Sequence, residues 1–256
     1  ISVGCGTSGE AGYLNLQSGR STTATGGLVV VSSGEGTATS SGQILVQSSN
    51  AGAGGSSGQL VFSSGTALTG NSGAVVIGTG AASAGRGGAV TLSVGSGTSG
   101  AGGSLSASAG RSTSLTGGQV VMSSGEGTAS SSGAIFVQSA NSGDAGTSGR
   151  LVFSSGSTQG GNSGAILIGS GVATGGRGGG IQITAGSGTS GAGGIVDIAS
   201  GRSTVHTGGL LTVRSGEGTA TSSGSVILQS ANSGGAGASG LLVFRAGSSM
   251  GGNSGA

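Results

Sequence analysis

Several residue types on which ordinary enzymes depend are nearly missing from this sequence of 256 residues. It contains no lysine, no tryptophan, one cysteine and one histidine. Charged residues make up 5% and aromatic residues 2%, whereas about 25% of the residues of a typical globular domain are charged. This composition argues against a conventional compact enzyme.

The charge and the apolar runs exclude two classes of partner. A net charge of +2, from eight arginines and six acids, gives no electrostatic footprint for nucleic acid. The longest apolar runs, such as residues 28–31, are far shorter than the roughly 18–20 residues of a membrane span. We therefore expect no nucleic-acid partner and no membrane insertion. The lone Cys5 allows no internal disulfide, so cysteine usage indicates no redox compartment.

Glycine spacings that resemble a phosphate-binding loop lack their usual context. The spacing G-x-G-x-x-G occurs three times, at Gly4, Gly6 and Gly9, at Gly95, Gly97 and Gly100, and at Gly186, Gly188 and Gly191. A dinucleotide-binding fold would follow it with a helix and with an acid some 20 residues later, and neither appears. A Walker loop needs a lysine. We expect no cofactor.

The sequence also lacks groups of residues that would indicate a catalytic or metal-binding site. His206 and Asp197 lie near serines, but the sister repeats carry Ala24 and Leu115 in place of the histidine, which indicates a surface substitution. The only aspartates, Asp144 and Asp197, are too few for a calcium-binding or pectinase-like solenoid. The sequence also has too few histidines and cysteines to form a zinc site. The sequence predicts no enzyme, no catalytic or metal residues and no small-molecule substrate.

What the sequence has is glycine in a regular repeat, with 66 glycines in all. A glycine opens a short apolar stretch at Gly12, Gly27, Gly42, Gly58, Gly73, Gly88, Gly103, Gly118, Gly133, Gly149, Gly164, Gly179, Gly194, Gly209, Gly224, Gly240 and Gly255. The step is 15 residues, or 16 at every sixth unit, which gives a super-repeat of 91 residues. Super-repeats span about 12–102, 103–193 and 194–256, the last incomplete, and their six unit types are numbered from Gly12.

Alternation within each unit predicts the fold. With the glycine as position 1, positions 3 and 5 are apolar in every complete unit, as in Leu14 and Leu16, which indicates a strand. Positions 10 and 12 hold Gly, Ala, Ser or Thr in nearly every unit, and predict a second wall close to the first. We expect an all-β fold, a parallel β-solenoid that runs as one segment over residues 1–256. The extra residue of the 16-residue units is expected to bulge from a corner.

Charged and amide residues recur at position 9 and predict a ladder that fixes the register of neighbouring units. The ladder consists of Arg20, Glu35 and Asn50, then Arg111, Glu126 and Asn141, then Arg202, Glu217 and Asn232. Each arginine is expected beside the glutamate of the next unit. Such solvated pairs contribute roughly 0–1 kcal/mol each.

Position 4 carries the strongest signal for an interface. It should face outward, yet in unit types two to five it is apolar with the single exception of Thr212, while in types one and six it is polar. The apolar set is Val30, Leu45, Val61, Val76, Val121, Phe136, Val152, Leu167, Ile227 and Val243. An outward apolar stripe predicts a surface buried against another copy of the chain, another structural chain or another part of the same polymer.

Threonines in one column raise a second possibility. Position 11 holds Thr22, Thr37, Thr98, Thr113, Thr128, Thr174, Thr189, Thr204 and Thr219. A threonine array on a 15-residue repeat resembles the ice face of insect antifreeze proteins, although no second column runs beside this one. An ice-binding or adhesive role is therefore an alternative.

Segments such as SGEGTATSSGQILVQSSN (33–50) and VGSGTSGAGGSLSASAGRST (94–113) resemble the repetitive Gly/Ser/Thr-rich extracellular proteins of diatoms and other microalgae. The resemblance covers the whole chain and implies an extracellular or cell-surface location and a structural role. The leading hypothesis is a structural repeat segment of an extracellular fibre or surface appendage that assembles laterally, end to end, or both. A further alternative is a non-catalytic stalk of a larger surface enzyme. Since neither end shows a polar cap, we also expect the array to continue, covalently or by stacking.

Overall fold

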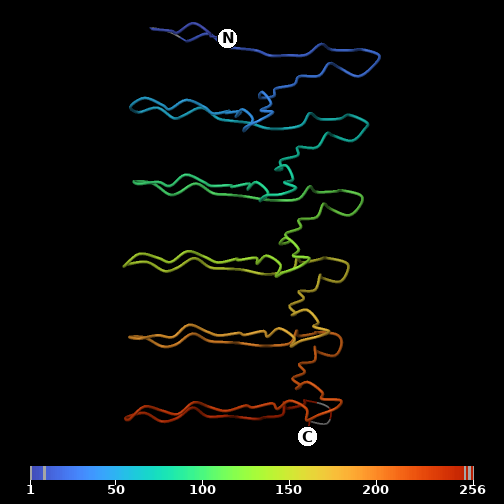
Figure 1. Cartoon of the computed structure of the whole chain (residues 1–256). Coiled ribbons are helices and arrows are strands. Elements are labelled where there is room, and N and C mark those ends of the chain that lie inside the picture. Colours follow the sequence, from blue (N-terminus) through green and yellow to red (C-terminus); the bar gives the residue numbers. More distant parts are fainter. Residues whose placement is uncertain (1, 8–9, 251, 253–254, 256) are drawn as a thin grey trace. The chain divides into compact units, whose positions relative to one another are not determined.

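The computed structural model describes residues 2–7, 10–250, 252 and 255. Throughout these residues the backbone forms irregular, extended stretches joined by bends and turns, with no helix and no strand (Figure 1). The chain divides into two units, Ile1–Ser123 and Ser124–Ala256, and the same local structure recurs in both. The prediction of an all-β fold, a single parallel β-solenoid over residues 1–256, is therefore wrong.

The 15-residue period is nevertheless visible in the backbone. In the 15-residue units a bend falls at positions 11–13, as at residues 22–24, 37–39 and 113–115. In the 16-residue units a turn replaces the bend, at residues 53–54, 144–145 and 235–236. Each unit thus consists of a triplet at positions 3–5, apolar at positions 3 and 5, followed by a loop that turns at a fixed place.

Glycines at positions 8 and 1 close these loops. The N–H of Gly27 donates to the carbonyl of Gly19, eight residues earlier, at 2.8 Å, and Gly118 donates to Gly110 at the same distance. The bond recurs in the loops of unit types six, one and two, where the donors are Gly12, Gly27, Gly42, Gly103, Gly118, Gly133, Gly194, Gly209 and Gly224. The loop is therefore held by its own ends.

The 16-residue units place their extra residue inside the loop. A Cβ built on Gly58 lies 3.4 Å from the Cβ of Ser48, so positions 7 and 1 still meet as they do in the shorter units. A tight turn takes up the added length, because the N–H of Gly55 donates to the carbonyl of Gly52 at 3.2 Å. Equivalent bonds of 3.4 Å join residues 146 to 143 and 237 to 234.

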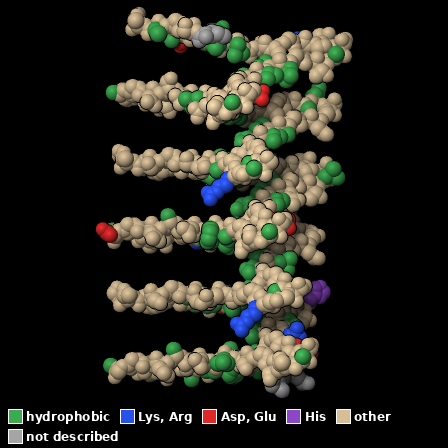
Figure 2. Space-filling view, in the orientation of Figure 1, with side chains coloured by type: hydrophobic (Ala, Val, Ile, Leu, Met, Phe, Trp, Pro, Cys, Tyr) green, Lys and Arg blue, Asp and Glu red, His purple; other side chains and the backbone are tan. Residues whose placement is uncertain are grey.

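No hydrophobic core forms among the described residues. None of them is buried, and even the position-3 side chains, which are less exposed than most, remain about half accessible, with 49% for Leu151. Apolar side chains accordingly lie on the surface along the chain (Figure 2). The thin two-walled core predicted between positions 3 and 5 and positions 10 and 12 is wrong.

Local hydrogen bonds compete with sheet formation in half of the unit types. A parallel ladder requires backbone groups of one unit to pair with those of the next. In the loops of unit types six, one and two the N–H of the next position-1 glycine is instead used to close the loop, as from Gly27 to Gly19. The predicted second wall also fails, because the bend at positions 11–13 contains position 12 and begins directly after position 10. The triplets are left without an opposing surface on which to pack.

Candidate interaction surface

Two apolar hollows stand out on the chain, and they are copies of each other. The first is lined by Phe62, Val75, Val76 and Ile77 and has a volume of about 420 Å³. The second has the same volume and is lined by the residues 91 positions later, Phe153, Ile166, Leu167 and Ile168. We call them the Phe62 hollow and the Phe153 hollow; the first lies in the unit 1–123 and the second in the unit 124–256.

Loop closure creates each hollow. A Cβ on Gly73 lies 3.5 Å from the Cβ of Ser64, so the chain returns to its starting point at the end of this loop. Phe62 lies two residues before Ser64, and Val75 lies two residues after Gly73. The contact between Ser64 and Gly73 therefore brings Phe62, at position 5 of a type-four unit, next to the triplet of the following type-five unit. The base of the Phe153 hollow repeats this geometry, with 3.5 Å between a Cβ on Gly164 and the Cβ of Ser155.

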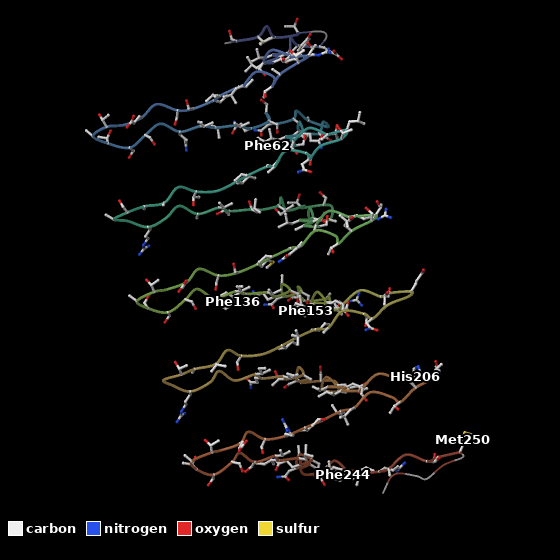
Figure 3. All side chains as sticks on the ribbon, turned by 90° about the vertical axis from the view of Figure 1, so that its right-hand side faces the viewer. Phe62, Phe136, Phe153, His206, Phe244 and Met250 are labelled. Atoms are coloured by element: carbon white, nitrogen blue, oxygen red, sulfur yellow. The ribbon has the colours of Figure 1, made fainter. Side chains whose placement is uncertain are left out.

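The side chains that line each hollow are entirely apolar and open to solvent. Each hollow combines one phenylalanine ring with three aliphatic side chains, none of which has a hydrogen-bonding group. The position-4 side chains stand out most, with 88% of Val76 and 93% of Leu167 accessible. Phe62 and Phe153 lie away from the loop tips, whereas Met250 lies at one (Figure 3). The arrangement can bind an apolar partner but offers no group for acid–base chemistry.

The predicted interface residues fall into two sets. Val76 and Leu167 line the hollows, as described. The others are exposed elsewhere along the described chain: Val30, Leu45, Val61, Val121, Phe136, Val152, Ile227 and Val243. Because positions 3 and 5 are exposed as well, exposure alone does not single out position 4. Burial of this set against another chain stays a prediction.

The position-9 residues lie at the start of the loops. Arg20 follows the closing Gly19, and Glu35 follows Gly34 in the next unit. None of the nine ladder side chains takes part in the side-chain hydrogen bonds of the described residues. Side-by-side pairing of arginine with glutamate therefore stays a prediction.

Serine side chains, which the sequence interpretation left without a role, organise several loops. In type-one units the residue after the arginine accepts a backbone N–H three residues on: Ser21 from Ala24 at 3.0 Å and Ser112 from Leu115 at 2.9 Å. The third copy, Ser203, accepts the N–H of His206 at 2.9 Å. His206 thus lies in a serine-capped bend, as its sister residues do. The recurrence of serine directly after the arginine in all three type-one units was the sequence signal that could have predicted this role.

The second glycine of the G-x-G-x-x-G spacing has a steric explanation. A Cβ on Gly97 would collide with the carbonyl oxygen of Gly100 and lie 2.8 Å from that of Ala101. Gly188 makes the same close approach in the next super-repeat. The second glycine is therefore needed so that the loop can fold onto its own backbone. No group of three metal-ligating side chains occurs among the described residues, and Cys5 is exposed.

The hollows themselves were missed at the sequence level. The signal was present, because position 5 of type-four units is a phenylalanine at Phe62, Phe153 and Phe244, and the type-five unit that follows 62 or 153 is aliphatic at positions 3, 4 and 5. Position 5 had been assigned to the interior, so its aromatic ring was not considered as part of a surface.

Comparison with known proteins gives no relative. No protein-family model matches the chain, and no curated protein or solved structure is significantly similar to it. In the described part of the chain there is also no apolar helix of membrane-spanning length.

Proposed function

We propose that this chain is a structural repeat segment of an extracellular fibre or cell-surface appendage, and that it assembles with copies of itself laterally, end to end, or both. One observation carries the proposal: every complete unit described presents a triplet at positions 3–5 whose first and last side chains are apolar and exposed, at the same place in a repeated local structure. The resemblance to Gly/Ser/Thr-rich extracellular repeat proteins supports the location.

The exposed apolar surface supplies the driving force for self-association. The accessible surface is 24,739 Å² for a chain of 23.0 kDa, whereas a compact monomer of this mass exposes roughly 9,600 Å². Removing apolar surface from water contributes about 25 cal/mol per Å². Since the triplets are not covered within the described chain, association with other copies is the route that covers them.

The low charge of the chain also favours self-association. Eight arginines and six acids are spread over 256 residues, and the net charge is only +2. Net charge far from zero keeps chains apart through repulsion, and this chain has little of it. Copies can therefore approach closely in physiological salt.

The proposal is tested by sedimentation velocity and negative-stain microscopy over a range of concentrations. We expect large species that grow with concentration and appear as fibres. Sulfate should promote assembly, because it strengthens apolar burial, whereas added sodium chloride should change it little, because few charges are present to be screened. A monodisperse monomer at all concentrations, without fibres, would overturn the proposal. Antibody labelling of intact, unpermeabilised cells tests the location.

The structure removes the main support for ice binding. That alternative depended on a flat threonine column, but position 11 is the first residue of the bend, as at Thr22, Thr37 and Thr113. A bent, irregular loop does not hold hydroxyl groups in a plane along a ladder. No observation favours the adhesive or stalk alternatives over self-assembly.

A further inference from the structure

We infer that the chain is an extensible element, whose closed loops store length and release it reversibly under tension. Each loop opens by breaking the contact between its own ends, so this mechanical property belongs to the single chain and goes beyond the proposed function. In a fibre of the kind proposed above, the loops would let the material stretch at low force and recover.

A closed loop hides most of the length of its backbone. The N–H of Gly27 lies 2.8 Å from the carbonyl oxygen of Gly19, at the two ends of one loop. The Cα atoms of residues joined by such a bond lie within about 6 Å of each other, whereas eight residues of extended chain span roughly 26–29 Å. Opening one loop therefore lengthens the chain by about 20 Å. The same bond closes nine loops of the described chain, which together store on the order of 180 Å.

Little else in the described chain resists opening. No described residue is buried or lies in a helix or strand, so no packed core has to be broken. The hydrogen bonds of these residues join positions at most nine apart, so that opening one loop leaves the bonds of the next unaffected. One hydrogen bond, spread over about 20 Å of released length, resists a force on the order of a few piconewtons. The loops therefore open independently and at low force.

The six unit types close their loops in different ways, which spreads the opening over a range of forces. Types six, one and two use the backbone bond described above. Type-five loops use a hydroxyl at position 7: Ser170 donates to the carbonyl of Gly179 at 2.8 Å, and Thr79 donates to that of Gly88 at 3.2 Å. No such bond joins the ends of the described type-three and type-four loops. These loops open first, and the backbone-bonded loops lengthen the chain afterwards.

Recovery is fast because each loop carries both of its ends. Closing a loop of about ten residues takes roughly 10–100 ns, far less than the duration of a mechanical cycle. The glycines that meet at the closing bond have no side chain to obstruct the return. Stretching and relaxation therefore follow the same force–extension curve, and no stored length is lost between cycles.

Two matched sets of alanine substitutions test the inference in single full-length chains held by their ends in magnetic tweezers. The position-10 set places a Cβ where it would collide with a backbone carbonyl oxygen of the same loop, and opens five of the nine loops. It consists of Gly36→Ala, Gly97→Ala, Gly127→Ala, Gly188→Ala and Gly218→Ala. The control set lies two residues earlier in the same loops, where a Cβ has nothing within 4 Å. It consists of Gly34→Ala, Gly95→Ala, Gly125→Ala, Gly186→Ala and Gly216→Ala. None of the ten glycines is buried, and both sets change the flexibility of the backbone equally.

We expect the position-10 set to be longer than the unmodified chain at low force. An open loop of eight flexible residues spans about 16 Å, roughly 10 Å more than a closed one, which gives about 50 Å for five loops. The control should differ by less than about 15 Å. At high force all three chains should have the same length, because every loop is then open and the contour lengths are equal.

Equal extension of the two sets at low force would overturn the inference, as would stretching and relaxation curves that separate. The measurement uses single tethered chains, so assembly does not enter it. A chain that stays monomeric in sedimentation but shows the expected difference in length contradicts the proposed function and supports the extensible loops. Fibres without that difference support the proposed function and contradict the extensible loops.

Discussion

Small residues at the base of each loop have a local steric cause. A Cβ on Gly27 would lie 3.0 Å from the nitrogen of Gly19 and 3.1 Å from the Cβ of Ser18. Position 7 is small for the same reason, since its side chain meets the glycine that begins the next unit. One close contact therefore explains two positions of the repeat, glycine at 1 and a small residue at 7, whereas a Cβ at position 8, as on Gly19, would meet nothing within 4 Å.

Replacing Gly127 by alanine tests whether this crowding is real. Its Cβ would collide with the carbonyl oxygen of Ser131 and lie 2.7 Å from that of Ser130, so we expect the loop to open. The bond from the N–H of Gly133 to the carbonyl of Gly125, 3.0 Å long, should be lost. A hydrogen bond contributes about 0.5–1.5 kcal/mol, so amide exchange of Gly133 should accelerate up to about tenfold.

The control for this experiment is Gly125→Ala. A Cβ at this position has nothing within 4 Å, although the residue lies in the same loop. Exchange of the Gly133 amide, followed by NMR, should stay close to that of the unmodified chain. Equal acceleration in both variants would contradict the steric explanation.

At the scale of the repeat unit, the sequence predicted the period of the backbone structure correctly but did not predict which backbone groups pair. The 15-residue step, the 16-residue exception and the turn-rich half of each unit all correspond to repeated backbone features, such as the bend at 22–24 and the turn at 53–54. Strand pairing could not be read from the sequence, because alternation at positions 3 and 5 reports which residues are apolar and not which backbone group each N–H will bond.

Glycine content decided the outcome at this scale. The N–H of Gly42 reaches the carbonyl of Gly34 within one loop, a contact that joins residues only eight apart. Closing a loop of eight residues costs about 0.6 kcal/mol less entropy than joining equivalent positions about 15 residues apart, which favours the local bond. The same glycines that were interpreted as permitting two close walls therefore permit a closed loop instead.

The turn of the first 16-residue unit offers a second test. Gly54 has φ of +87°, a conformation that costs a residue with a Cβ about 1–2 kcal/mol. The equivalent positions in the later super-repeats are Ala145 and Ala236, and φ is positive at neither. We expect Gly54→Ala to switch this turn to the form adopted by residues 143–146, while the closing bond from Gly55 to Gly52 is retained.

Three-bond amide–α couplings and chemical shifts of residues 52–55 measure the switch. The reciprocal change, Ala145→Gly, is the control, and should leave its turn with negative φ, since glycine tolerates both signs. Retention of positive φ at an alanine in position 54 would show that the surrounding loop, and not the residue, sets the turn.

For the whole molecule, the lack of burial means that unfolding exposes little additional surface to solvent. The accessible surface of 24,739 Å² is already about three-quarters of the roughly 33,000 Å² of an extended chain of this mass. The dependence of unfolding free energy on denaturant scales with newly exposed surface. A dilute monomer should therefore show an m-value about one-third that of a compact protein of 256 residues, without a sharp transition.

Urea titration followed by circular dichroism and by NMR peak positions measures this slope, below the concentration at which the chain associates. The monomer spectrum should be that of irregular backbone, without helix or sheet bands. Material assembled as proposed above serves as the comparison and should require more urea, because its apolar side chains would be covered. A steep, cooperative transition in the dilute monomer would contradict the structure.

Loop closure over eight residues also bears on how such a gene can change. Because the bond from Gly118 to Gly110 depends on nothing outside its own loop, deletion or duplication of a 91-residue block by unequal recombination leaves every remaining loop intact. Length can thus drift between alleles without a folding penalty. Selection would then act on the number of blocks and not on the local structure of any one block.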